Sequence, residues 1–330
     1  MENDKINTKG VVKNYPGSTL KIIAIVTMFI DHLGAGILER YLGCMESSGG
    51  DFRGALGNSK FLLKMIDEIF RCVGRLGFPI FIFLLIEGFK HTRSVPKYAR
   101  NLLIFALISE FPFDSAFNSD YAFEFSYQNV YFTLFFGLLV VWGISIIRKK
   151  DLSKLPIVPI RILGTIVASL GLYILIADSI LMFPVSLLKL NTSSIIFLGF
   201  IWGIIFVIDI VLNVIITKKF TENSNMIFIS ATIITIGMIA ATLIRCDYGA
   251  YGVLAILMMY LASENWEKAY LFTVLTLSIS SPVEIIALGG LPIVQKYNGE
   301  RGLKLKYIFY IFYPAHLLLI AVLEHCVGIF

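Results

Sequence analysis

The chain has few cysteines and none of the common motifs for metal, nucleotide or hydrolytic chemistry. Its four cysteines are scattered, with no C-x-x-C motif and no histidine at metal-ligand spacing, so we predict neither a disulfide framework nor a metal site. Walker, G-x-G-x-x-G, H-E-x-x-H and G-x-S-x-G motifs are also missing. Nucleotide hydrolysis, Rossmann-type redox chemistry and serine hydrolysis therefore lack support.

Charge is scarce as well, at 15% of residues, whereas hydrophobic residues make up 57% and the mean hydropathy is +0.80. These values predict an all-α fold, a polytopic integral membrane bundle of helices. The first nineteen residues are polar and basic, without the apolar core of a signal peptide. We therefore expect a cytosolic tail over 1–19 and a single membrane domain over 20–330. The net charge of +5 is expected to mark cytosolic loops, with no nucleic acid as a partner.

Apolar runs long enough to span a bilayer, about 17–25 residues each, predict about ten transmembrane helices. They lie near 20–43, 71–90, 98–117, 128–147, 159–182, 193–216, 226–244, 248–262, 268–290 and 307–328. The run 248–262 is short, and 283–292 is interrupted by Gly289, Gly290 and Pro292. Either of these two segments could be re-entrant.

Basic loops indicate a cytosolic N-terminus, because lysine and arginine concentrate on the cytosolic side of a membrane protein. They follow the second, fourth and sixth runs, and the tail is basic too. The pattern fails at 291–306. Counting the crossings from a cytosolic N-terminus places this loop outside the cell, yet it carries Lys296, Arg301, Lys304 and Lys306. Either the charge rule does not hold there, or one late segment does not cross fully.

The longest polar connection, 44–70, has two interpretations. Phe61, Leu62, Met65 and Ile69 recur at helical spacing beside charged residues, which is typical of an amphipathic helix lying on the outer face. The same pattern also fits an extension of the second span.

The first run carries Lys21, Asp31 and His32. Lys21 and His32 are eleven residues apart, almost three helical turns, so they share one face at an axial separation of about 16 Å. Histidine can act as a general base near neutral pH, and Asp31 could orient it or raise its pKa. Asp31 is about 100° away around the helix and could instead serve a different helix. The structural alternative is an interhelical hydrogen bond that only holds the bundle together.

The second run places Arg75 just before a Gly-x-Pro break, where a freed backbone is tolerated if it lines a cavity. A guanidinium there could hold a phosphate or polarise a carbonyl. Glu87 and His91 share a face at i, i+4, and Glu87 could pair with His91, Lys90 or Arg93. An interfacial ion pair is an equally good explanation of Glu87.

Polar groups also interrupt the later runs. Asn129 opens the fourth run and suits hydrogen bonding to a ligand or to a neighbouring helix. In the last run, Pro314 is expected to kink the helix so that His316 turns inward. The basic cluster with Arg301 and Lys304 could attract a nucleotide phosphate or anionic lipid headgroups. The chemistry of these residues leaves two main classes: a membrane-embedded group-transfer enzyme with His32 as base, and a transporter that relays protons or ions. A third class is a non-catalytic scaffold.

Several motifs, in order, resemble the TraX family, whose plasmid member acetylates the N-terminus of pilin. They are Ile30-Asp-His-Leu-Gly34, Gly74-Arg-Leu-Gly-Phe-Pro79, Glu87-Gly-Phe-Lys-His-Thr92, Asp247-Tyr-Gly249, Tyr297-Asn-Gly-Glu-Arg-Gly302 and Phe312-Tyr-Pro-Ala-His-Leu317. The first span also resembles that of transmembrane acyltransferases, in which ten residues separate a basic residue from a histidine, here Lys21 and His32. In that group the histidine is taken as catalytic, and the basic residue is linked to the acyl-CoA donor.

The resemblance implies an acetyltransferase in the cell membrane that uses acetyl-CoA as donor and modifies an envelope-associated acceptor it does not identify. We expect His32, Asp31 and Arg75 to be catalytic. Donor binding is expected from Lys21, Arg93, His91, Arg301 and Lys304. Supporting or acceptor-binding roles are expected for Glu87, Asn129, Tyr313 and His316. Membrane lipid is the other expected partner, and no metal is expected. On the alternative hypothesis, a secondary transporter would use Asp31, His32 and Glu87.

Overall fold

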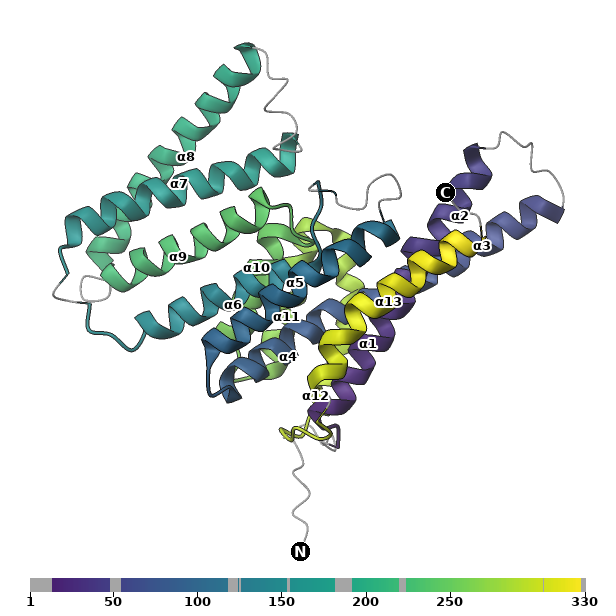
Figure 1. The fold of residues 1–330 in the computed structure, drawn as a ribbon. Coiled ribbons are helices and arrows are strands. Elements are labelled where there is room, and N and C mark those ends of the chain that lie inside the picture. The colour runs from purple at the N-terminus through teal and green to yellow at the C-terminus, as the bar shows by residue number, and fades with distance from the viewer. Residues whose placement is uncertain are drawn as a thin grey trace, which may run out of the picture. The chain divides into compact units, whose positions relative to one another are not determined.

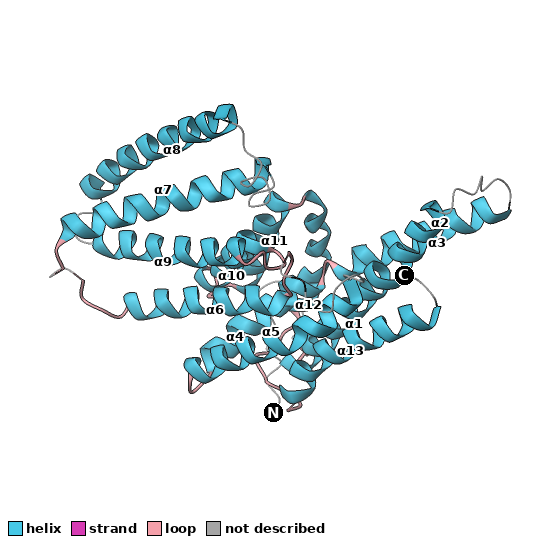
Figure 2. Cartoon of the chain, turned by 45° about the horizontal axis from the view of Figure 1, so that its top comes forward, coloured by secondary structure: helices cyan, strands magenta, loops and turns pink. Residues whose placement is uncertain are grey.

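A computed structural model describes residues 14–47, 55–117, 124, 126–152, 155–181, 192–219, 224–304 and 306–327. Every regular element in these ranges is a helix (Figure 2). Most of the predicted tail, 1–13, and the centre of the connection 44–70 fall outside the described residues.

The described residues form two compact units. Unit 1 comprises residues 1–131 and 258–330, and unit 2 comprises residues 132–257. The helices of unit 1 are α1 (Gly17–Leu33), the π-helical turn η1 (Gly34–Leu38), α2 (Glu39–Ser47), α3 (Ala55–Gly74), α4 (Gly77–His91), α5 (Val95–Phe117), α11 (Trp266–Ser280), the 3₁₀ segment η3 (Pro282–Gly290), α12 (Leu291–Gln295) and α13 (Lys306–Val327). Helices α6 (Val130–Ile147) and α10 (Gly249–Leu261) span the two boundaries, and α7 (Ile157–Leu181), α8 (Thr192–Lys219) and α9 (Ser224–Leu243) lie in unit 2 (Figure 1).

Within the described ranges, five helices are long and apolar enough to cross a membrane. They are Gly17–Glu46, Ser59–His91, Val130–Ile147, Ser224–Leu243 and Ile308–Cys326, and each coincides with a predicted apolar run. Shorter apolar helices lie at Val158–Tyr173, Trp202–Leu212, Gly249–Leu261 and Pro282–Gln295. The all-α membrane bundle is therefore confirmed, and the count of about ten spans stays a prediction.

The connection 44–70 is resolved in favour of an extended second span. Helix α3 packs along α1 and continues into α4, so that one apolar helical stretch runs from Ser59 to His91. The two helices are separated by a break at Arg75 and Leu76. Pro79 explains the position of this break, because it has no N–H to donate to the carbonyl of Arg75 one turn earlier.

The predicted single span 268–290 is wrong, because the chain reverses direction at Ser281 and Pro282. Helix α11 ends at Ser280, and η3 and α12 pack back against it. The Tyr270 hydroxyl donates to the carbonyl of Ala287 over 2.9 Å, which ties the returning segment to the middle of α11. Fifteen residues of α11 rise only about 22 Å, short of the roughly 30 Å hydrocarbon core. The chain thus folds back as a helical hairpin, which corresponds to a re-entrant segment at 283–292, one of the two alternatives that the sequence left open.

This reversal explains the basic loop 291–306. The Tyr15 amide donates to the Lys296 carbonyl over 2.9 Å, and the Gly17 amide donates to the Glu300 carbonyl over 2.7 Å. The loop therefore caps the start of α1 and lies at that end of unit 1, called the near end below. This position of the basic loop fits the alternative in which one late segment does not cross fully, and the cytosolic side stays a prediction.

Two further contacts define the near end. The Lys90 ammonium donates to the Ser263 carbonyl over 2.9 Å, and the Tyr297 hydroxyl donates to Glu87 over 3.0 Å. The turn of the near-end loop uses Gly299 and Gly302 at φ of 83° and 66°, which favour glycine because other side chains are strained there.

Helix α13 runs parallel to α1 and beside it (Figures 1 and 2). Both begin at the near end, and at the opposite, far end Arg40 of α2 pairs with Glu324 of α13 over 2.5 Å. Helix α5 also packs along α13. Helix α13 therefore packs against both α1 and α5.

In unit 2, α7 lies between α8 and α9. Glycines allow close approach between α6, α9 and α10: Gly137 lies against Ile256, and Gly237 lies against Val140. Small residues at helix contacts are typical of membrane bundles, in which packing replaces the hydrophobic effect.

We expect a cysteine at position 303 to be labelled from the same side of the membrane as one at position 93, and from the side opposite to Cys326. Leu303 is exposed in the near-end loop, whereas Cys326 is exposed at the far end of α13. Single-cysteine variants treated with a membrane-impermeant maleimide measure this, with a permeant maleimide as the control. Labelling of positions 303 and 93 from opposite sides would contradict the re-entrant hairpin, whereas positions 303 and 326 report only whether α13 crosses.

Candidate functional site

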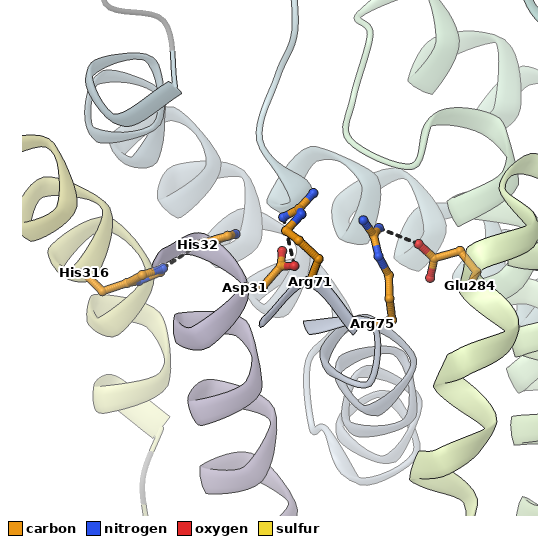
Figure 3. A network of polar contacts seen from close by, with 6 residues as sticks. All are labelled: Asp31, His32, Arg71, Arg75, Glu284 and His316. Carbon is orange, nitrogen blue, oxygen red and sulfur yellow. Dashed lines mark hydrogen bonds and ion pairs between the residues drawn. The ribbon is translucent and has the colours of Figure 1, made fainter. Parts of the chain in front are cut away.

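A pair of histidines lies at the middle of the first span (Figure 3). Nδ1 of His32 on α1 is 2.7 Å from Nε2 of His316 on α13. The two imidazole rings are parallel to within 8°, with their centroids 4.9 Å apart, so they lie edge to edge in nearly one plane. His316 is only 3% exposed, so it turns inward as expected from the sequence, and α13 continues as one helix across Pro314.

The hydrogen bonds of His316 define the protonation of the neutral pair. Nδ1 of His316 is 2.8 Å from the Phe312 carbonyl, which only accepts, so this nitrogen carries the proton. Nε2 of His316 then accepts, and Nδ1–H of His32 donates to it. This tautomer leaves Nε2 of His32 with a lone pair, which is the state required of a general base.

Aromatic rings hold the His32 imidazole in place. Phe117 of α5 and Tyr313 of α13 meet it edge to face, at centroid distances of 5.4 and 6.0 Å. Phe29 and Phe312 contact the His316 ring in turn. Such edge contacts stabilise one ring orientation while keeping an apolar environment. Tyr313, predicted as a supporting residue, therefore does contact the histidine pair.

Asp31 does not orient His32. Its carboxylate pairs with Arg71 of α3, with Nη1 and Oδ1 2.9 Å apart, on a different side of α1 from His316 (Figure 3). The roughly 100° step between adjacent helical residues explains this, and the alternative in which Asp31 serves another helix is the one observed. Gly74 makes the contact possible, because a Cβ there would collide with the Asp31 side chain.

Arg75 pairs with Glu284 of η3. Its Nη1 donates to Oε1 over 2.7 Å, and Glu284 is 2% exposed. Arg71 and Asp31 lie within electrostatic reach of Glu284. In Figure 3 the two ion pairs lie side by side across α1, α3 and η3, and the histidine pair lies on the other side of Asp31.

Lys21 and His32 share the α13-facing side of α1, as their spacing predicts. The Lys21 ammonium lies 5.7 Å from the centre of the Phe309 ring, near the start of α13. It is also within electrostatic reach of Arg301. A cationic group at the near end and the histidine pair at mid-depth are thus aligned along one helix pair.

The other predicted donor-binding residues are at the near end. Glu87 accepts from Tyr297 and pairs with His91 over 3.2 Å, so the choice among its predicted partners falls on His91. Burial, followed by the Glu87 carboxylate, raises the pKa of Tyr297 and keeps its hydroxyl available as a donor. Arg93, Arg301 and Lys304 are exposed there.

Asn129 uses its polar groups within the protein. Its side-chain amide donates to the carbonyl of Ala106 over 2.9 Å and to Glu110, and its Oδ1 accepts from the amide of Tyr131 at the start of α6. It therefore caps α6 against α5, the neighbouring-helix alternative. Among the described residues, no group of three or more possible metal ligands lies together.

Sequence patterns did not single out Glu284 or assign a partner to Arg71. One signal was present for Glu284, since it is an isolated acid inside the apolar run 268–290. For Arg71 the signal was its i, i+4 spacing to Arg75 on one helical face.

These features define a multi-pass helical membrane protein with a half-buried histidine pair and two ion pairs at mid-depth. The chain belongs to the TraX family: residues 16–209 and 203–324 match the family described as TraX protein. A similar protein is described as "Probable fimbrial assembly protein FimC, serogroup H1" of Dichelobacter nodosus. The two are 25% identical over 309 residues, 91% of this chain and 92% of that protein. No solved structure matches the chain.

We predict that Gly74→Ala destabilises the protein by about 1–3 kcal/mol, because the added methyl group collides with Asp31 and displaces its pairing with Arg71. Thermal unfolding in detergent measures the loss. Gly43→Ala in α2 is the matched control, since no atom lies near its added methyl group, and it should be neutral or stabilise by up to about 1 kcal/mol. Equal stability of the two variants would contradict a close contact at Gly74.

Proposed function

We propose that this protein is an integral-membrane acetyltransferase that moves an acetyl group from acetyl-CoA to an amine or hydroxyl of an envelope-associated acceptor. The observation that carries the proposal is the run of hydrogen bonds from His32 to His316 and from His316 to Phe312, from which we infer an unprotonated Nε2 on His32. A histidine pair in a membrane span is costly, and an ionisable group there suggests a site.

In the proposed reaction, Nε2 of His32 removes the proton from the acceptor nitrogen or oxygen as that atom attacks the thioester carbonyl. The tetrahedral intermediate collapses, the carbon–sulfur bond breaks, and the imidazolium returns the proton to the coenzyme A thiolate. His316 accepts the Nδ1–H of His32 throughout and stabilises the charged imidazolium. Arg75 pairs with Glu284 on the other side of Asp31 from the histidine pair, so we assign it a structural role in place of the predicted catalytic one.

The donor is proposed to enter from the near end, which would face the cytosol. Exposed Arg93, Arg301 and Lys304 would hold its phosphates, and Lys21 would guide it along the α13-facing side of α1. Lys21 and His32 are about 16 Å apart along the helix axis. This distance would let the phosphates of the donor stay at the membrane boundary while its thioester reaches His32 at mid-depth. His91 and Glu87 would support this entrance through their pairing.

Membership of the TraX family supports the proposal, because that family is associated with pilin acetylation. The similar protein of Dichelobacter nodosus is described as a fimbrial assembly protein. The proposed acceptor is accordingly a protein N-terminus, glycan or lipid of the envelope.

A transporter is the second candidate, supported by the row of charged groups in Figure 3. The pairs of Asp31 with Arg71 and of Arg75 with Glu284 join three elements at mid-depth, as relays in transporters do. Proton or ion flux in proteoliposomes that depends on Asp31 or Glu87, without coenzyme A binding, would favour it.

We expect His32→Gln to lower acetyl transfer by about 10²–10⁴-fold, the usual contribution of a general base. Acetyl transfer is measured by mass spectrometry of envelope proteins and polymers from cells with and without the gene. The affinity for acetyl-CoA is measured by calorimetric titration of the purified protein. The affinity should be retained, since the donor-binding residues are elsewhere.

His325→Gln is the matched control on α13, because His325 is exposed and lies two turns beyond the pair. It should leave transfer unchanged. Absence of acetyl-CoA binding in the wild-type protein would refute the enzyme hypothesis.

A further inference from the structure

Helices α1–α2 and α13 keep one register from the histidine pair to the far end. The bonds from His32 to His316 and from Arg40 to Glu324 both join residues 284 positions apart. Between them, Gly36 lies against Ile320 and the Glu324 carboxylate, so closely that a Cβ would have to displace them. The three contacts are steps along a single parallel helix pair.

The π-helical turn η1 lies between His32 and Arg40 and rotates Arg40 toward the face of His32. In a regular α-helix, eight residues turn through about 800°, which would leave Arg40 roughly 80° away from His32. A π-helical turn bonds i to i+5 and takes up one extra residue, which removes about 100° of rotation. Two whole turns then separate the two residues, and both face α13.

Arg40 also connects to the ring that contacts His32. Its Nη1 donates to Oε2 of Glu324 over 2.5 Å and lies 3.4 Å from the carbonyl of Ala116. The next residue is Phe117, whose ring meets the His32 imidazole. One guanidinium therefore ties α2 to α13 and to the last turn of α5.

The Glu324 carboxylate depends on this arginine. Its side chain is 4% exposed, and within the described residues its other oxygen, Oε1, has no hydrogen-bond partner. A buried ion pair with an unsatisfied oxygen is weak support for stability compared with an apolar pair, so a role in specifying register explains it better.

We propose that Arg40 and Glu324 are positioning residues that set the register of α1 against α13 and thereby hold His32 in its Nδ1–H tautomer. The proposal rests on the proposed function only in its effect on catalysis, because the tautomer can be observed without any reaction. Arg40 and Glu324 act through the histidine pair and need not touch substrate.

The first experiment is ¹⁵N NMR of histidine-labelled protein in detergent. The chain has four histidines, and His→Gln variants assign their signals. We expect Nδ1–H signals from both His32 and His316 in the wild type. Glu324→Gln and, separately, Arg40→Gln should each convert the His32 signal to a mixture that includes the Nε2–H tautomer.

The control is Glu46→Gln, which removes another ion pair of α2, the one that joins Glu46 and Lys60 over 3.0 Å. This variant should leave all four histidine signals as in the wild type. A double variant that exchanges the charges, Arg40→Glu with Glu324→Arg, should restore the wild-type His32 signal.

The second experiment measures acetyl transfer. Both single variants should lower kcat by about 10- to 100-fold, the cost of a small misplacement of a reacting group, and leave KM for acetyl-CoA within about twofold. Glu46→Gln should change neither, and the charge exchange should recover most of kcat.

An unchanged His32 tautomer in both single variants overturns the proposal, whatever the activity. A tautomer that changes in the single variants but is not restored by the charge exchange overturns the ion pair as its cause. A wild-type protein without transfer activity refutes the proposed function alone, since the NMR result still decides the register.

Discussion

The structure of unit 1 depends on the cost of placing ionisable groups in a bilayer, where each must find a partner on another element. At mid-depth His32 bonds to His316, Asp31 pairs with Arg71, and Arg75 pairs with Glu284. Adjacent residues 31 and 32 thus connect α1 to two different helices. Together the three pairs fix α1 between α13 and α3, and they anchor the re-entrant hairpin through Glu284.

Irregular backbone makes these pairings possible. The break before α4 places Arg75 at the end of a helix, the 3₁₀ segment η3 carries Glu284 back into the membrane, and the π turn η1 aligns Arg40 with His32. Gly74 and Gly36 permit the close contacts with Asp31 and Ile320 that a larger residue would block. In the 3₁₀ segment η3, the side of the backbone that carries Glu284, Ala287 and Gly290 is buried within the protein.

Much of the fold could be predicted because hydropathy and helical periodicity are local properties. The apolar runs, the shared face of Lys21 and His32, and the basic near-end loop all follow from residue spacing. The span 268–290 was mispredicted, because run length cannot distinguish a crossing from a hairpin that turns at Ser281 and Pro282. For the loop 291–306, the number of crossings and the basic charges predict opposite sides of the membrane. The contacts of Tyr15 and Gly17 with that loop support the side predicted by the charges.

The sequence alone determined that this is a helical membrane protein with costly polar groups at Asp31, His32, Arg75 and His316. Only the tertiary structure decided which of them pair. Partner choice depends on the rotation and register of separate helices, and a step of one residue moves a side chain by about 100°. For that reason Asp31, next to His32 in the chain, faces Arg71, whereas the partner of His32 comes from α13, 284 residues away.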